Sequence, residues 1–108
     1  MEQALLNTPP DHAWLLSAGA RVAPNVVFRT FVQETVVLNL DTGRYHGLNP
    51  TAGRMLEEVE RRATLGEAAR RLAEEYGQPL HEVERDLCEL CLALADRKLI
   101  EIDAPRPG

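Results

Sequence analysis

Two cysteines, Cys88 and Cys91 in the segment CELC, are the residues whose type and spacing could carry chemistry. Such a pair could be a redox dithiol or one half of a zinc site. A redox pair usually lies at a helix N-terminus, where the dipole lowers the thiol pKa, whereas this pair falls in the middle of a helical pattern. A zinc site needs about four ligands, and beyond the two cysteines the sequence offers only His12, His46 and His81. We therefore interpret both cysteines as small apolar residues in or beside the core, and we expect no metal.

No other group of residues in the sequence supports catalysis. There is no serine or cysteine nucleophile with a pair of partners, no glycine-rich phosphate loop and no acid–base pair. The 108 residues and the formal net charge of −5 favour one small domain and argue against a protein dedicated to phosphate backbones. The sequence contains no run of 18 apolar residues and no evident secretory signal. We expect a cytoplasmic protein that is not an enzyme, uses no cofactor, and binds neither membranes nor nucleic acids.

Three short strands are expected over residues 26–32, 34–40 and 44–48. The first, VVFRTFV, is rich in β-branched and aromatic residues. The second, ETVVLNL, alternates along its length, and DTG follows it as a turn signal. These features predict an antiparallel meander whose first and third strands are its edges.

The alternation of the second strand places Val36, Leu38 and Leu40 on one face and Val37 on the other. Gly43 supplies the left-handed residue that a three-residue hairpin loop needs. The third strand therefore follows the second directly, as its hairpin partner.

Three helices follow the strands. Asn49 is the expected N-cap of the first, with Pro50 at its first helical position. Thr64 and Glu67 form a capping box for the second, and Gly77 ends it. The helices are expected over about residues 50–62, 64–77 and 79–97.

The predicted architecture is α+β: a three-stranded antiparallel meander followed by three helices, similar to a winged helix-turn-helix, over residues 21–103. The segment LIEI at 99–102 alternates and predicts a short final strand. Residues 1–20 carry tandem prolines and no clear period, so we expect a partly disordered extension in which residues 14–16 could fold back. Residues 104–108 are expected to be a disordered tail.

The third helix is apolar over a wider arc than docking on its own domain requires. One stripe suffices for docking, and a second group lies beside it. The second group could cover a neighbouring helix or line a groove. The stripe is Leu80, Val83, Leu87, Leu90, Cys91 and Leu94, and the second group is Cys88, Leu92 and Ala95, with His81 and Glu84 among them.

The run VVLNLDTGRYHGLNPTAGRMLEEV, followed by TLGEAARRLAEEYG and a long helix ending in LADRKLI, resembles the PqqD-like family. Members of this family are recognition elements for ribosomally made, post-translationally modified peptides. The hairpin LNLDTGRYHGLN followed directly by PTAGRML is most similar to the stand-alone recognition proteins of lasso-peptide pathways. The resemblance covers about residues 22–102 and includes the hairpin exit formed by Tyr45, Leu48 and Asn49. It departs at Gln78, where an aspartate usually precedes the proline.

The resemblance implies an open third strand, which a precursor's leader peptide joins as a fourth antiparallel strand in the cleft beside the third helix. It also implies two separate partner enzymes, a cysteine-protease-like leader peptidase and an ATP-using macrolactam synthetase. The sequence suits this role, since RYHGL lacks the lysine or proline that usually blocks an edge. Gly47 permits close backbone approach, and Tyr45 offers an apolar face with a polar tip. The expected peptide-binding residues are Arg44, Tyr45, His46, Gly47, Leu48, Glu84, Cys88, Cys91, Leu92 and Ala95.

Three alternatives stay open. Tyr45 and Leu48 could be plain core residues, with the edge covered by the N-terminal segment. The protein could be a PqqD-type chaperone that serves a radical enzyme. It could also be a winged-helix DNA-binding regulator, although an acidic helix is unfavourable in a DNA groove. Between His81 and Asp96 that helix has Arg85 as its one basic residue, against Glu82, Glu84, Asp86, Glu89 and Asp96.

Overall fold

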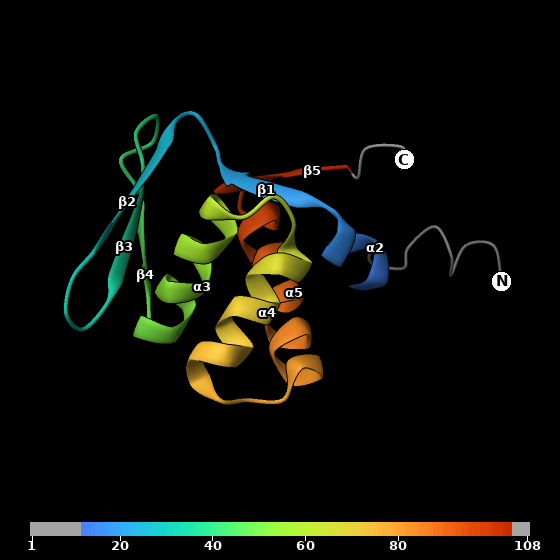
Figure 1. The fold of residues 1–108 in the computed structure, drawn as a ribbon. Coiled ribbons are helices and arrows are strands. Elements are labelled where there is room, and N and C mark those ends of the chain that lie inside the picture. The colour runs from blue at the N-terminus through green and yellow to red at the C-terminus, as the bar shows by residue number, and fades with distance from the viewer. Residues whose placement is uncertain (1–11, 105–108) are drawn as a thin grey trace, which may run out of the picture.

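The protein's structure, a computed structural model, describes residues 12–104. A three-stranded sheet stands on one side of a helical bundle, and a two-stranded ribbon crosses the end of the bundle (Figure 1). The elements in chain order are α2 (His12–Ser17), β1 (Gly19–Val22), β2 (Val26–Thr30), β3 (Thr35–Asn39), β4 (Tyr45–Leu48), α3 (Pro50–Arg61), α4 (Leu65–Tyr76), α5 (Leu80–Asp96) and β5 (Ile100–Asp103).

The predicted meander is confirmed. β2 pairs with β3, and β3 pairs with β4, both antiparallel, so that β4 is an edge strand of this sheet. Gly43 has a φ of 73°, the left-handed conformation that the DTG turn requires. The strands are slightly shorter than expected, because the first turn already begins at Phe31, whose N–H donates to the Glu34 carbonyl.

The predicted helices and their caps are also confirmed. The Asn49 side chain accepts a hydrogen bond from the Ala52 N–H, and Thr64 accepts one from the Glu67 N–H. Gly77 ends α4 in the left-handed conformation. These caps fix where α3 begins directly after β4, which places the helix against the sheet.

One face of the sheet packs on the helices and the other faces outward. The predicted alternation holds, and Val37 is the residue on the core face, with Thr35 and Val26 also buried. Leu40, on the opposite face, is 57% exposed. α3 approaches the sheet closely because Gly53 lies against Thr35, where a Cβ would collide with the threonine hydroxyl.

The ribbon of β1 and β5 extends the domain beyond the expected boundary. β5 confirms the predicted final strand, and it pairs antiparallel with β1, with Gly19 opposite Asp103. α2 packs against α4 and α5, and its Leu15 side chain is fully buried. The domain was expected to begin at residue 21, but residues 12–20 are also part of it, because their apolar side chains complete the core. Residues 1–11 of the expected extension and residues 105–108 of the expected tail lie outside the described residues.

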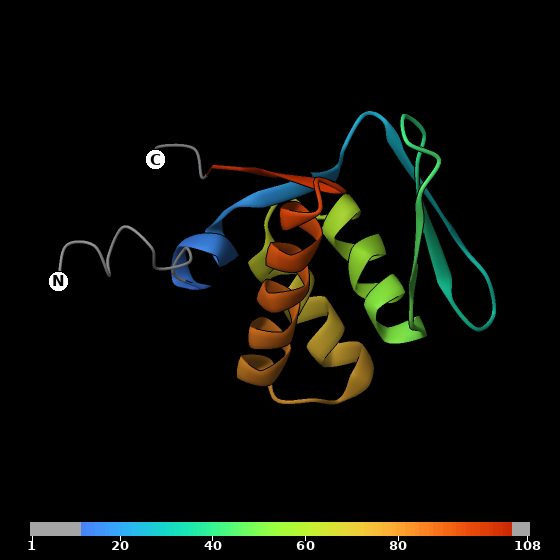
Figure 2. The same ribbon diagram turned by 180° about the vertical axis from the view of Figure 1, so that it is seen from behind.

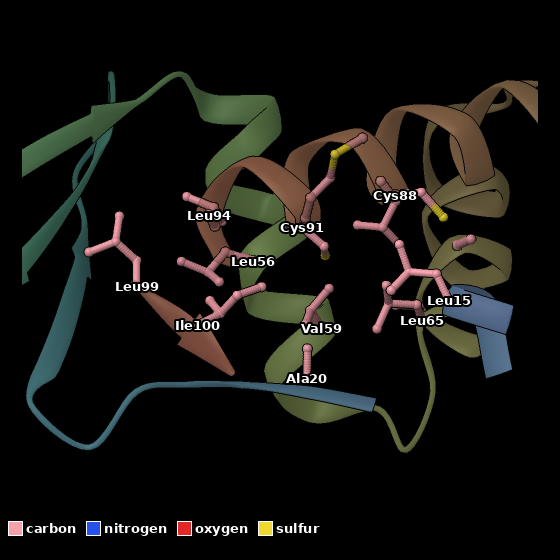
Figure 3. Close-up of a cluster of buried hydrophobic side chains, with 14 of the residues drawn as sticks. Leu15, Ala20, Leu56, Val59, Leu65, Cys88, Cys91, Leu94, Leu99 and Ile100 are labelled. Carbon is pink, nitrogen blue, oxygen red and sulfur yellow. The ribbon is translucent and has the colours of Figure 1, made fainter. Parts of the chain in front are cut away.

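The core lies between α5, the other helices and the ribbon (Figure 3). Aliphatic side chains from the ribbon, α3 and α5 meet there, among them Ala20, Ile100, Leu56 and Leu94. Burial of these side chains is the main favourable term in the stability of a domain of this size. Within residues 12–104, the helices are all too short or too polar to span a bilayer.

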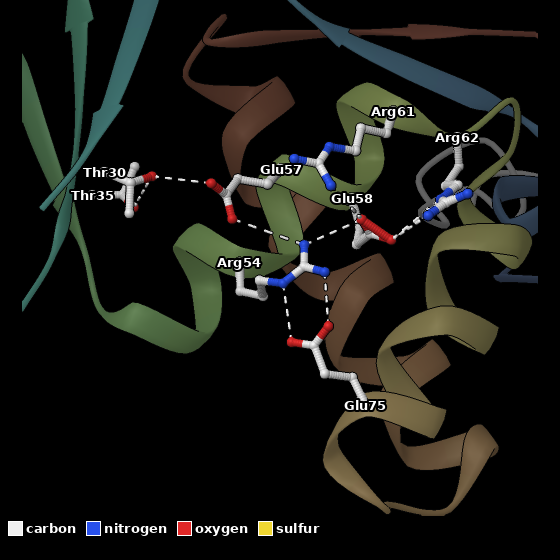
Figure 4. A network of polar contacts seen from close by, with 8 residues as sticks. All are labelled: Thr30, Thr35, Arg54, Glu57, Glu58, Arg61, Arg62 and Glu75. Atoms are coloured by element: carbon white, nitrogen blue, oxygen red, sulfur yellow. Dashed lines mark hydrogen bonds and ion pairs between the residues drawn. The ribbon is translucent and has the colours of Figure 1, made fainter. Parts of the chain in front are cut away.

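A buried carboxylate organises α3 (Figure 4). Glu58 is 1% exposed, and its two oxygens accept from Arg54 and Arg62, each at 3.1 Å. Burial raises the pKa of this carboxyl, but the hydrogen bonds from Arg54 and Arg62 outweigh burial and hold the pKa below its ordinary value. The buried charge is thus compensated rather than isolated.

The network extends from α3 in two directions. Arg54 reaches α4, where its guanidinium lies 2.7 Å from the Glu75 carboxylate, and this hydrogen bond raises the pKa of Arg54. On the other side, the Thr30 hydroxyl donates to Glu57 at 3.4 Å and lies 3.2 Å from the Thr35 hydroxyl. α3 is therefore held to both α4 and the sheet, and this fixes the position of β4 relative to the helices.

Candidate peptide-binding edge

The outer edge of β4 presents unpaired backbone groups. At the hairpin, the Asn39 N–H donates to the Arg44 carbonyl at 2.8 Å. Hydrogen-bonded pairs alternate along an antiparallel ladder, so the next such pair is Val37 with His46. The N–H and C=O groups of Tyr45 and Gly47 therefore point away from β3, and within residues 12–104 no other strand pairs with them.

The side chains of β4 divide between two faces. His46 and Leu48 are half-buried and face the helices, and Leu48 packs against the core. Tyr45 is 72% exposed and shares the outer face with Gly47, beside which the Glu34 carboxylate lies. Tyr45 is therefore not a core residue.

One flank of α5 faces this edge. Arg97, the C-cap residue of α5, lies with its guanidinium 3.4 Å from Nδ1 of His46. The two side chains line a hollow of about 350 Å³ together with Asn39, Thr42, Arg44 and Leu99. β4 and the end of α5 thus form two walls of one groove.

The same flank continues along α5 toward its N-terminus. Residues 86, 90, 93 and 97 share one side of the helix by their spacing. Asp86, at the far end, lines a second hollow of about 380 Å³ with Thr51 and Met55 of α3. By helical spacing, Leu90 and Ala93 lie on the flank that runs from Asp86 to Arg97, and the sequence analysis did not select this flank for peptide binding.

The flank that the sequence reasoning did select faces the other way. Cys88 is fully buried and Cys91 is 1% exposed, so neither side chain is accessible in this structure, and their burial does not support the prediction that they bind the peptide. Cys88 points to the part of the core where Leu15 of α2 lies (Figure 3). Figures 1 and 2 show α2 on one side of α5 and the three-stranded sheet on the other.

Glu84, Leu92 and Ala95 are half-buried and share the flank of Cys88 by helical spacing. Ala95 lines a hollow with Asn25 and Ile100, at the ribbon end of the molecule. Glu84 and Leu92 therefore lie on the flank away from the β4 edge, whereas the hollow at Ala95 also includes Asn39, which bonds to Arg44 at the hairpin. A helix with an apolar surface on both sides gives no sequence signal for which side stays open. The sequence shows Arg97 only as a cation at the expected C-terminus of the helix.

The cysteines have no reactive character in this setting. Burial raises the pKa of Cys88 to about 11 and that of Cys91 to about 12, so both thiols are protonated at neutral pH. Both cysteines are free. Among residues 12–104, no group of three or more histidine, cysteine, aspartate or glutamate side chains is arranged to hold a metal ion.

Comparison with known proteins gives the family. The family model for coenzyme PQQ synthesis protein D (PqqD) matches residues 34–100, from the β2–β3 turn to the start of β5. The chain belongs to the PqqD family. No curated protein sequence matches the chain.

Two solved structures share the PqqD fold with this chain. The first, TbiB1 in complex with the TbiA(beta) leader peptide, is 32% identical, with a TM-score of 0.68, and the match covers 75% of this chain and 94% of that one. The second, a lasso peptide synthetase B1 complexed with the leader peptide, is 24% identical, with a TM-score of 0.70 and coverage of 78% and 99%. The α+β architecture predicted from the sequence is therefore the architecture of the family.

Proposed function

We propose that this protein binds the leader segment of a ribosomally made precursor peptide by strand addition to β4, and presents the precursor to separate maturation enzymes. The observation that carries the proposal is the open edge of β4, where the N–H and C=O groups of Tyr45 and Gly47 lack a neighbouring strand among the described residues. A peptide main chain satisfies such groups, and side-chain pockets beside them add specificity.

Among residues 12–104, β4 lacks the features that usually protect an edge strand. Natural edge strands carry lysine, proline or a bulge, or they are covered by another element. β4 contains neither lysine nor proline, and α2, the first described element, packs on the opposite side of α5. The relative TbiB1, which is 32% identical to this chain, was solved with a leader peptide and supports the same role here.

The proposed partners are a leader peptidase and a macrolactam synthetase of a lasso-peptide pathway, and the outer face of the sheet offers a surface for one of them. Val27, Phe31, Leu40 and Tyr45 are all exposed there. Contiguous exposed apolar residues mark interaction surfaces in soluble proteins. In this role the protein performs no chemistry itself: it raises the local concentration of precursor beside the enzyme, which can strengthen apparent affinity by about 10²–10⁴.

The DNA-binding alternative receives no support from the charges. The surface of α5 is acidic, and Arg97 at its end lies in the groove beside β4. The choice between a lasso pathway and a radical-enzyme pathway depends on the precursor, because both would use the same edge. A precursor with the leader removed and a lactam ring formed would identify the lasso pathway.

The experiment is a titration of the protein with the leader of the precursor encoded beside its gene, followed by fluorescence anisotropy and amide hydrogen exchange. We expect saturable binding and slower exchange at the amides of Tyr45 and Gly47. The amide of His46 is an internal control, since it already bonds to Val37. Binding without protection of Tyr45 and Gly47 would show that the leader binds elsewhere, and absence of binding would refute the proposed function.

A further inference from the structure

The hollow at the Arg44 end of the groove has an unusual electrostatic character. Its lining includes two arginines and a histidine, Arg44, Arg97 and His46, and no carboxylate. The Arg97 guanidinium lies 3.4 Å from Nδ1 of His46. A ring nitrogen, unlike a carboxylate oxygen, carries no negative charge that could neutralise the guanidinium. Within residues 12–104, neither Arg44 nor Arg97 makes an ion pair.

This arrangement contrasts with the other arginines that enter contacts in the structure. Arg21 pairs with Glu101 and Asp103, and Arg54 with Glu58 and Glu75. Arg97 lies at the C-terminus of α5, where the helix dipole stabilises its positive charge. Arg44 follows the hairpin turn and has no such helix dipole beside it. Two guanidinium groups that line one hollow, without an ion pair among residues 12–104, have the donor chemistry that an anion requires.

The backbone beneath these side chains is fixed. The Arg44 N–H donates to the Thr42 hydroxyl at 3.1 Å, and the Arg44 carbonyl accepts from Asn39. The Arg97 N–H donates to the Ala93 carbonyl at the end of α5. The two arginine side chains therefore extend from rigid positions on opposite walls of the groove.

The direction of a bound peptide decides which of its residues meets this site. A peptide antiparallel to β4 passes Leu48 first, then His46, then Arg44, and opposed residues point to the same face of the sheet. The peptide residues opposite His46 and Arg44 therefore point into the hollow, toward the C-terminal end of the paired segment.

We propose that Arg44, His46 and Arg97 form a carboxylate-binding site, which selects leaders that carry an aspartate or glutamate at one of the two inward positions opposite His46 and Arg44. Arg guanidinium groups bind a carboxylate with charge-assisted, often bidentate, hydrogen bonds. The inference rests on the proposed leader binding, and it adds which peptide chemistry the edge prefers and in which register.

The test is selection of a displayed library of random peptides on immobilised wild-type protein and on variants. We expect to recover peptides that bind the wild-type protein and do not bind the Gly47→Pro variant. These peptides should be enriched in aspartate and glutamate on the C-terminal side of their apolar segment. On the double variant Arg44→Glu/Arg97→Glu the preference should invert to lysine and arginine. The matched control Arg70→Glu/Arg71→Glu, two exposed changes on α4 with the same total change in charge, should keep the acidic preference.

A single acidic peptide recovered in this way should bind roughly 10- to 100-fold more weakly when its acid is replaced by the amide, and this difference should vanish with Arg97→Gln. Circular dichroism confirms that each variant is folded. Two outcomes would overturn the inference and leave the proposed function standing. In the first, peptides that depend on Gly47 show no acidic preference. In the second, the acidic preference is the same in the double variant as in the wild type. Recovery of no peptide that depends on Gly47 would overturn both.

Discussion

Both flanks of α5 carry apolar residues, but only one of them is covered by another helix. The flank with Cys88 is closed by α2, whose Leu15 is fully buried. The flank with Arg97 faces an edge strand across a hollow. The position of the groove therefore depends on which flank of α5 another element covers. The short α2 covers the flank with Cys88, and the flank with Arg97 stays open among the described residues.

The largest expected effect concerns the closed flank. Leu15→Ala should lower the free energy of unfolding by about 2–5 kcal/mol, because it removes a fully buried side chain and leaves a cavity. Trp14→Ala, on the exposed side of the same helix, is the matched control and should have a much smaller effect. Urea denaturation measures both, and equal stabilities would show that α2 does not seal this flank.

The open flank should respond in affinity instead. Gly47→Pro removes an N–H from the free edge and should weaken leader binding at least about 100-fold while the domain stays folded. Gly47→Ala keeps the N–H, and its added Cβ meets only the movable end of the Glu34 side chain, so its affinity should stay within a few-fold of wild type. If the proline variant is folded and binds the leader normally, the peptide does not pair with β4.

A pair of variants two residues apart on α5 separates the flanks directly. Leu92→Glu should destabilise the domain by about 1–3 kcal/mol and leave the affinity of the folded protein unchanged, because it lies on the flank of Cys88. Leu90→Glu places a charge in the wall of the groove and should also weaken leader binding, by about tenfold or more. Thermal melts and anisotropy titrations of the two proteins test this. Lost binding in Leu92→Glu alone would restore the flank expected from the sequence.

The smallest expected effect concerns the cysteines. Since burial raises the pKa of Cys88 to about 11 and of Cys91 to about 12, the reactive thiolate is scarce below these values and grows only as the pH approaches them. Alkylation at pH 8 should be slow in the folded protein and fast in denaturant. Chelator should leave the melting temperature unchanged, and Cys88→Ala with Cys91→Ala should retain the fold; stoichiometric zinc in purified protein would contradict this.

The sequence carried most of the fold because its signals were local. The caps at Asn49 and Thr64, the turn at Gly43 and the stop at Gly77 each act within a few residues, and all four are found where predicted. The alternation of β3 was also readable, but not which face met the core, because the more apolar face, with Leu38 and Leu40, is the one that faces outward.

What the sequence could not specify depends on contacts between distant segments. α2 and β1 are short and carry no strong period, and they are ordered through packing on α5 and pairing with β5. Their docking determines that Cys88 is a core residue and that Leu92 lies away from the groove. The pairing of His46 with Arg97 likewise joins residues 51 positions apart, which no local pattern announces.

The ribbon of β1 and β5 has a consequence for how this domain can be joined to others. Because Gly19 lies opposite Asp103, the chain enters and leaves the ribbon at the same end, on the side of the molecule away from β4 (Figures 1 and 2). The paired ends of the ribbon therefore offer two attachment points on the same side of the domain. A fusion that starts from Gly19 or Asp103 begins on the side away from the peptide edge.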